Sequence, residues 1–436
     1  MNLETEIRIN FKPTKYTLMK IKLIIISLLL ISLTSAKKIT EEIDLGISAY
    51  VDGGRFQLDK PENTRKGEFL TRSGARWSVI GNFSENFTAF ANLHWLWWRN
   101  MATDLGLFHI VGAKFNSEGE AFFEYRLSDY FRSKCGIMKI KYNPDSRNLG
   151  EYILRSEAYP IFIESSTGAD LLDTSHAKVL GLEYKLDYGM LYQRGLVFFE
   201  QTNVPTNDMS FAFFTGINPF VFELGLGIAA KRYIKTGNKV NNKLLTDTLK
   251  SYIKDQALSA SAVNAAFTAK VDIKRLFKLP FEEKFQVYTE IGVLGMKRDS
   301  RIYDTWIKHI PIMFGFDLPT GGLFSDFGLE FEYFRNPFYD KKYPLADGGG
   351  NKYSPLPSVI ADTEYEEGEI PRYHRDDWKW SLFISKSLNK QLDLKVRAAN
   401  DHLRLLEWDS DIANGGRPVT FKPKDWYFLV RVEWHN

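Results

Sequence analysis

The sequence contains a single cysteine, Cys135, so it cannot form an intrachain disulfide. It also lacks any run of about 20 apolar residues, the length that a membrane-spanning helix needs. The HExxH, GxSxG, P-loop and CxxC motifs are absent, and the seven histidines are scattered along the chain. These absences argue against a disulfide scaffold, a helical membrane protein and the common hydrolases. We expect no enzyme activity, no cofactor and no metal site.

One shorter apolar run, residues 23–33, has the features of a secretory leader. Lys20 and Lys22 precede it, and small residues follow it up to Ala36. A basic region, an apolar region and a small-residue exit are typical of a cleavable signal peptide. We expect cleavage after Ala36 and a leader over 19–36, with residues 1–18 as an upstream extension. The alternative is a short N-terminal anchor helix, for which the run is too short.

An excess of charge of one sign is also lacking once the leader is removed. The chain has 57 basic and 54 acidic residues, and the whole excess of positive charge lies within residues 1–36. The remaining chain has no net charge and therefore no sign of the basic surface that nucleic-acid-binding domains carry. We expect no nucleic-acid partner.

What the chain does have is strict alternation of apolar and polar residues. In residues 180–188, leucines and tyrosines alternate with Gly181, Glu183, Lys185 and Asp187. Side chains on a strand point to opposite faces with a period of two, so one face is apolar and the other is charged. A membrane β-barrel needs this alternation, because it has lipid outside and water inside. A soluble antiparallel sheet with one solvated face alternates in the same way.

Similar runs recur along the chain, and many have ten residues or more. Soluble strands average about five or six residues, whereas tilted membrane strands need about nine to eleven. We predict about seventeen strands, near residues 43–51, 75–83, 87–98, 107–115, 121–128, 134–142, 177–188, 190–201, 209–217, 221–234, 257–273, 284–297, 309–318, 324–334, 377–387, 391–404 and 425–434.

The predicted connections alternate between tight turns and long polar stretches. Outer-membrane barrels have short periplasmic turns, longer outer loops and both termini on the periplasmic side. The alternation fails once, between residues 43 and 176, where one strand is missed or split. An additional strand at 152–164 gives eighteen strands, the number we favour. A false strand near the start gives sixteen.

The last predicted strand, 426–434, ends in Trp434. It resembles the closing strand of bacterial outer-membrane proteins, whose final aromatic residue is part of the signal for the assembly machinery. Here His435 and Asn436 follow that aromatic residue. By pattern, residues 37–436 resemble a porin-like outer-membrane protein. The resemblance implies an all-β transmembrane antiparallel β-barrel in one domain. It also implies outer-membrane lipid and the barrel-assembly machinery as partners, and leaves a homo-oligomer open.

Aromatic residues cluster near the ends of the predicted strands. Amphipathic rings favour the headgroup level of a bilayer, so we interpret them as aromatic girdles. The alternative is a sugar-stacking track inside the pore. The tryptophans concerned are Trp95, Trp97, Trp98, Trp378, Trp380, Trp426 and Trp434.

Charged residues on the predicted strands must point into the lumen. Lipid would reject them, at about 2–4 kcal/mol for a basic residue at the bilayer midplane. The predicted lumen-facing residues are Glu183, Lys185, Asp187, Glu223, Glu290, Glu330, Glu332, Asp393, Lys395 and Arg397.

The segment 143–152 breaks the alternation and is charged and irregular. It either folds into the lumen as a constriction loop or is an ordinary outer loop with Asn and Asp turns. Backbone that is neither helix nor strand is tolerated at membrane depth only where water or protein satisfies it. Asp145, Arg147, Glu151 and Arg155 are the candidates for setting size and charge selectivity.

Three functions fit these patterns. The first is an outer-membrane channel for passive diffusion of small polar solutes. The second is a non-channel outer-membrane barrel that displays the long loops 335–376 and 405–424 for adhesion or polysaccharide binding. The third is a secreted soluble β-sandwich. Strand length, loop alternation, aromatic ends and the closing strand favour a barrel.

Overall fold

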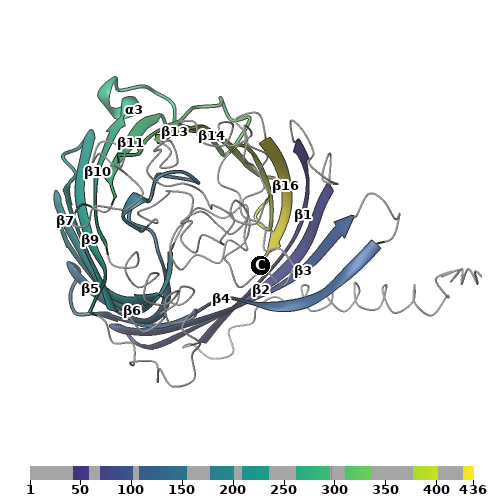
Figure 1. The fold of residues 1–436 in the computed structure, drawn as a ribbon, viewed down its shortest axis with the longest axis horizontal. Helices are drawn as coiled ribbons and strands as arrows, with labels where there is room; N and C mark the ends of the chain where they lie inside the picture. The colour runs from purple at the N-terminus through teal and green to yellow at the C-terminus, as the bar shows by residue number, and fades with distance from the viewer. Residues whose placement is uncertain are drawn as a thin grey trace, which may run out of the picture.

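A computed structural model of the chain describes residues 43–57, 69–101, 108–154, 177–200, 209–234, 262–294, 296, 310–334, 377–400 and 426–436. Within these residues, sixteen antiparallel strands close into one barrel (Figure 1). Every strand pairs with its neighbours in sequence, and the first pairs with the last. The predicted leader and the long loops 335–376 and 405–424 fall outside the described residues.

The strands are β1 Ile43–Gln57, β2 Phe69–Ser84, β3 Phe87–Met101, β4 Phe108–Arg126, β5 Phe131–Ile140, β6 Ala177–Tyr188, β7 Leu191–Glu200, β8 Met209–Ile217, β9 Phe222–Ile234, β10 Ala262–Asp272, β11 Gln286–Val293, β12 Ile312–Asp317, β13 Asp326–Phe334, β14 Asp377–Ser387, β15 Leu392–Ala399 and β16 Trp426–His435. Two short helical turns accompany them, η1 Tyr152–Leu154 and α3 Ile273–Leu276. In the described part of the chain, no helix has the length and apolar character to cross a membrane.

The strand number corrects the prediction of eighteen. The runs 107–115 and 121–128 are parts of one strand, β4. Its register with β3 shifts between Asn92 and His94 and again between Leu96 and Trp98. Such irregularities disturb the alternation of side chains, which is why one strand looked like two. The extra strand proposed at 152–164 is also wrong at its start, because Tyr152 begins the turn η1 inside the barrel.

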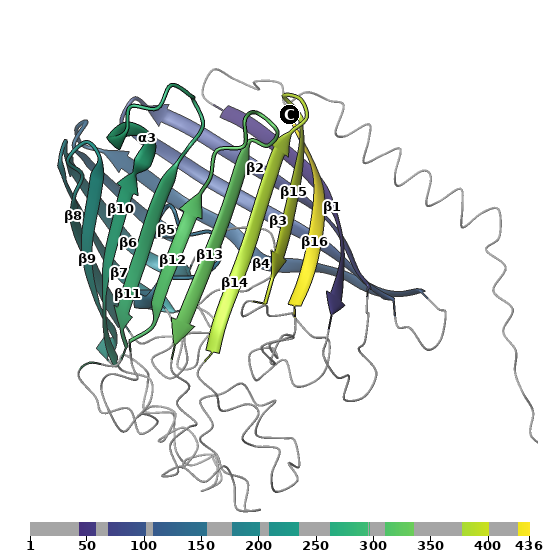
Figure 2. The same ribbon diagram turned by 90° about the horizontal axis from the view of Figure 1, so that it is seen from above.

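With sixteen strands, the connections sort by length between the two rims. Those after even-numbered strands include the tight turns 85–86, 127–130, 189–190, 218–221 and 388–391. Those after odd-numbered strands include 141–176, 235–261, 335–376 and 400–425. Asn436 exchanges hydrogen bonds with Ile47, so the chain end lies beside the first strand at the rim of the tight turns. Figure 2 shows α3 at this rim, which we call the turn rim.

The two faces of the wall differ in chemistry. On β9 the outward side chains Phe222, Leu224, Leu226 and Ile228 are 46, 40, 61 and 48% exposed. The residues between them point inward, where Glu223 pairs with Lys270 of β10 at 2.5 Å. The alternation that predicted a two-faced strand therefore describes an apolar outer surface and a polar interior.

Candidate constriction inside the barrel

Residues 141–154, which we call the lumenal segment, leave β5 and fold inward. Figure 1 shows the segment within the ring of strands, and η1 at its end lies against β9, β10 and β11. Gly150 and Glu151 have positive φ angles of 80° and 59°, and Pro144 has no backbone N–H. The segment therefore cannot continue the ladder of β5. Its backbone N–H groups need other partners, because buried N–H groups are rarely left unpaired.

Glu330 of β13 supplies one set of these partners. Its carboxylate accepts hydrogen bonds from the backbone N–H groups of Asn148 and Leu149, both at 2.9 Å, and from that of Arg147. The hydroxyl of Tyr288 on β11 donates to the same carboxylate at 2.9 Å. Glu330 is 1% exposed. One wall carboxylate thus satisfies three successive N–H groups of irregular backbone.

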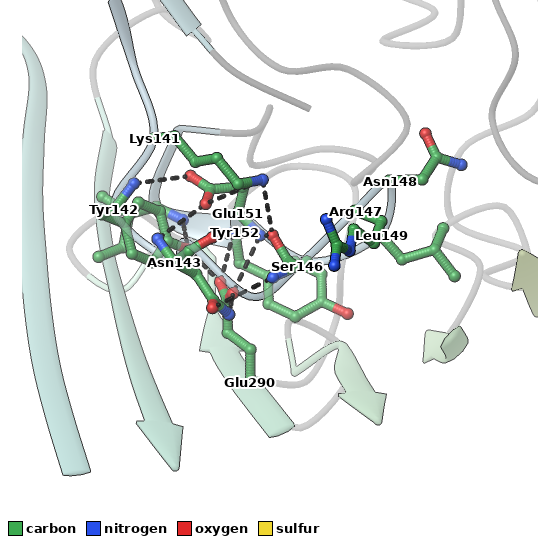
Figure 3. A network of polar contacts seen from close by, with 12 residues as sticks. Lys141, Tyr142, Asn143, Ser146, Arg147, Asn148, Leu149, Glu151, Tyr152 and Glu290 are labelled. Atoms are coloured by element: carbon green, nitrogen blue, oxygen red, sulfur yellow. Dashed lines mark hydrogen bonds and ion pairs between the residues drawn. The ribbon is translucent and has the colours of Figure 1, made fainter. Parts of the chain in front are cut away.

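Glu290 of β11 supplies the second set (Figure 3). The backbone N–H groups of Glu151 and Tyr152 donate to it at 3.0 and 2.7 Å. The side-chain amide of Asn143 donates at 2.9 Å, and the hydroxyl of Tyr142 also donates. Glu290 is fully buried, so its charge is stabilised by these donors rather than by water.

Glu151 ties the two ends of the lumenal segment together. Its carboxylate accepts from the backbone N–H groups of Asn143 at 2.9 Å and Tyr142 at 3.3 Å. The ammonium of Lys141 lies 4.0 Å away (Figure 3). Glu332 of β13 completes the set by accepting from the Tyr152 hydroxyl at 3.0 Å. Carboxylates from two strands, β11 and β13, therefore hold the segment to the wall, and the carboxylate of Glu151 closes the segment on itself.

Burial controls the ionisation of this segment. The pKa of Glu151 is raised to about 7, chiefly by burial; the ammonium of Lys141 opposes this change, and the nearby carboxylate of Glu290 adds to it. Burial also lowers the pKa of Lys141, against the attraction of Glu151. Burial and the carboxylates of Glu290 and Glu151 raise the pKa of Tyr142 well above its usual value, which keeps the hydroxyl protonated as a donor.

Apolar packing fixes the end of the lumenal segment. Ile153 and Leu154 are buried in a cluster with Phe198, Phe214 and other inward-facing apolar residues of the wall. Glycine is required at Gly292 of β11, where an added Cβ would lie 2.6 Å from the Cβ of Tyr152. The inner wall is thus apolar or small where it meets Ile153, Leu154 and Tyr152, in contrast to the buried carboxylates that hold the rest of the lumenal segment.

The middle of the lumenal segment bears ion pairs to the wall. Lys270 contacts Asp145 at 2.8 Å and thereby joins it to Glu223. Arg147 lies 3.8 Å from Asp317 and 3.7 Å from Asp326, and its guanidinium lies 5.3 Å from the ring centroid of Phe383. Asp145 and Arg147 are partly exposed, as is Lys141 at the start of the segment.

The structure separates the predicted constriction residues into different roles. Asp145 and Arg147 lie at the surface of the lumenal segment, whereas Glu151 is fully buried beneath it. Arg155 falls outside the described residues. Sequence reasoning did not single out Lys141, Tyr142, Asn143 or Lys270. The Asn143-Pro144-Asp145 turn and Gly150 were the available signals, and they marked where the segment bends but not what holds it.

The predicted lumen-facing residues also divide into groups. Glu290, Glu330 and Glu332 meet under the lumenal segment, and Glu223 reaches it through Lys270. The others lie on further strands. Glu183 pairs with Arg194 and Lys185. On β15, Lys395 pairs with Glu433 at 2.7 Å, Asp393 lies 3.9 Å from His435, and Arg397 is buried. Asp187 is exposed beside the turn 189–190.

The predicted girdle is described only in part. Trp378 and Trp426 are 60 and 36% exposed at the starts of β14 and β16, and Trp434 is half-buried near the turn rim. Trp380 is half-buried on β14. The ring of Trp378 lies 4.9 Å from that of Tyr333, measured between centroids. The side chains of Trp95, Trp97 and Trp98 are outside the described set.

A closed antiparallel barrel of sixteen strands encloses an inward-folded segment. The chain is a porin-like β-barrel. No family model matches the sequence, and no curated protein matches it. Its fold is similar to that of Salmonella typhi OmpF in complex with daunomycin, with 10% identity, a TM-score of 0.47 and coverage of 90% of this chain and 97% of that one. A triple mutant of Rhodopseudomonas blastica porin is 10% identical with a TM-score of 0.43, over 90% of this porin-like barrel and 100% of the other chain.

Proposed function

We propose that this porin-like barrel is a channel of a bacterial outer membrane, through which small polar solutes cross by passive diffusion. The apolar outer surface of β6 and β9 suits lipid, and the inward-facing charges suit water. In this proposal the turn rim and both chain ends face the periplasm, as in barrels with short periplasmic turns. Outer-membrane lipid and the assembly machinery that reads the closing strand are its partners.

The lumenal segment is the observation that carries this proposal. A barrel that served only to display outer loops would have no need to hold charged, irregular backbone inside its wall. Here two wall strands, β11 and β13, contribute buried carboxylates to hold it. In this proposal Asp145 and Arg147, which the segment carries inside the barrel, are fixed charges that influence which solutes pass.

A thiol-block experiment tests the channel and the constriction together. Within the lumenal segment Pro144 is the exposed residue, and Cys135 lies on the outer face opposite Leu182. We expect single-channel conductance from the Cys135→Ser protein in a planar bilayer. With Pro144→Cys added, a charged methanethiosulfonate reagent should lower each conductance step.

The matched control is Leu182→Cys in the same background, because Leu182 is 50% exposed on the lipid side of β6. Its reaction should leave the conductance unchanged. A folded, membrane-inserted barrel without conductance would contradict the channel and favour the loop-display alternative. Conductance that the Pro144→Cys adduct does not alter would remove the segment from the permeation path.

A further inference from the structure

The turn rim carries a cluster of exposed apolar side chains on one side of the barrel. Phe220, in the turn 218–221, is 80% exposed, and Phe277 and Leu276 beside α3 are 66 and 44% exposed. We call residues 218–221 and 273–284 the shelf. Large apolar side chains clustered on an exposed surface indicate an interaction site.

Hydrogen bonds join the two parts of the shelf into one unit. The Asp272 side chain caps α3 by accepting the backbone N–H of Arg275 at 2.9 Å and pairs with the Arg275 guanidinium at 3.1 Å. The same guanidinium donates to the backbone carbonyl of Phe220 at 3.1 Å. The Phe220 and Phe277 side chains are therefore presented by a connected surface and not by independent loops.

Backbone strain accompanies the exposed ring of Phe220. Its φ angle is 54°, and that of Lys278, just after α3, is 51°. A bulky residue in this left-handed region is a genuine outlier, because its Cβ comes too close to the backbone carbonyl oxygen. Glycine would adopt both conformations without strain. Phenylalanine at a strained, solvent-facing turn is explained if its ring has a binding role.

The shelf also offers ammonium groups. Among the described residues, no carboxylate lies within ion-pair distance of Lys274 or Lys278, whereas Lys284 interacts electrostatically with Asp317, which lies beside Arg147 of the lumenal segment. Two of the three nearby acids are engaged elsewhere. Asp272 caps α3, and Glu283 accepts the backbone N–H groups of the turn 320–322, which lowers its pKa. The third acid, Glu282, accepts the Lys274 ammonium at 2.7 Å through its backbone carbonyl.

The position of the shelf fits the headgroup layer of a bilayer. Phe220 is two residues before Phe222, the first outward apolar residue of β9. At about 3.3 Å per residue, the shelf lies within roughly 7 Å of the apolar band, and the headgroup layer is about 5–7 Å thick on each side. Figure 1 shows α3 at the outer edge of the ring, away from the lumen, and Figure 2 shows it at the turn rim.

We propose that the shelf docks in the headgroup layer at the turn rim and binds anionic phospholipid. Phe220, Leu276 and Phe277 would enter the boundary between headgroups and acyl chains. The ammonium group of Lys278 would contact a lipid phosphate and increase binding about fivefold near an anionic surface. This inference rests on the membrane location in the proposed function and not on conductance.

Fluorescence quenching by brominated lipid tests the shelf. In a Cys135→Ser background, Phe277→Cys, Leu226→Cys and Asn389→Cys are each labelled with bimane and reconstituted as the full chain. The vesicles contain phosphatidylcholine with or without phosphatidylglycerol, brominated near the headgroup end of the acyl chain. Leu226 is the lipid-facing reference, and Asn389 is an exposed residue of another turn at the same rim.

We expect quenching at positions 226 and 277, weak quenching at 389, and an increase at 277 with the fraction of phosphatidylglycerol. Lys278→Gln should weaken that dependence by about fivefold. Quenching at 226 without quenching at 277, including protection of 277 by a second copy, would overturn the shelf. So would quenching at 277 that ignores lipid charge. Absence of quenching at 226 would instead contradict the membrane location itself.

Discussion

Two regions of the inner wall use carboxylates in different ways. Under the lumenal segment, Glu290 and Glu330 accept backbone N–H groups. At the seam where β1 meets β16, Asp52 instead takes the Arg431 guanidinium in two hydrogen bonds of 2.6 and 2.9 Å. That guanidinium lies 3.8 Å from the ring centroid of Tyr50. The difference shows that an inward-facing acid need not face solute: on one side it holds a loop, and on the other it joins strands.

The largest effect should come from the seam. Asp52→Asn leaves the Arg431 guanidinium, which is 1% exposed, without its carboxylate. Breaking a buried pair from one side costs about 3–5 kcal/mol in the free energy of unfolding. We expect that loss in urea unfolding of the reconstituted barrel, followed by tryptophan fluorescence. The double variant Asp52→Asn, Arg431→Met should recover part of it, because it removes the unpaired buried charge; equal losses in both variants would show that this unpaired charge is not the cause.

The second prediction concerns the docking of the lumenal segment, as distinct from the stability of the seam. Glu330→Gln removes the charge that accepts three backbone N–H groups. We expect docking of the lumenal segment to weaken by roughly 2–4 kcal/mol, because hydrogen bonds to charged groups contribute about 1.5–3 kcal/mol. Hydrogen exchange of residues 141–154 should rise while that of β1 and β16 stays the same.

Glu223→Gln is the control for that variant, since Glu223 reaches the lumenal segment only through Lys270. It should change the hydrogen exchange of residues 141–154 far less than Glu330→Gln does. Equal exchange in the two variants would mean that the backbone acceptors are not what holds the segment.

A smaller effect tests the packing of η1. Gly292→Ala would place a methyl group 2.6 Å from the Cβ of Tyr152. Overpacking of this kind costs about 1–3 kcal/mol, so we expect the lumenal segment to shift and its exchange to increase. Gly53→Ala is the matched control on β1, because nothing lies within 4 Å of a Cβ added there. An unchanged segment in Gly292→Ala would show that the wall moves to accommodate it.

The smallest effect, counted per pH unit, should come from the titration of Glu151. The pKa of Glu151 is raised to about 7 in the docked segment, above its ordinary value near 4.5. The docked state therefore binds more protons than the released state between these values. Docking is strongest below about pH 4.5 and weakens by at most about 1.4 kcal/mol per pH unit up to pH 7. The mobility of a spin label at Pro144→Cys should increase over this range, and Glu151→Gln should abolish the change.

Alternation predicted most of the fold but not the roles of the inward acids. Residues 180–188 and 222–228 alternate because one side faces outward, and this pattern predicted a barrel only together with strand length, loop alternation, aromatic ends and the closing strand. The register shifts between β3 and β4 made one strand look like two, because they interrupt the period of two. Glu151 was expected to line the constriction and is buried: its carboxylate accepts the backbone N–H groups of Tyr142 and Asn143, while its own backbone N–H donates to Glu290 of β11, 139 residues later in the chain. Local pattern contains no information about such partners.

The lumenal segment also constrains the order in which the molecule can form. Arg147 precedes its acceptor Glu330 by 183 residues, and Glu151 precedes Glu290 by 139. The segment follows β5, so its backbone donors exist before the strands that satisfy them. Contacts of such long range form slowly, because a large loop must close first. The lumenal segment can therefore dock fully only after β13 is in place. A docked segment then indicates that the strands up to β13 have paired correctly.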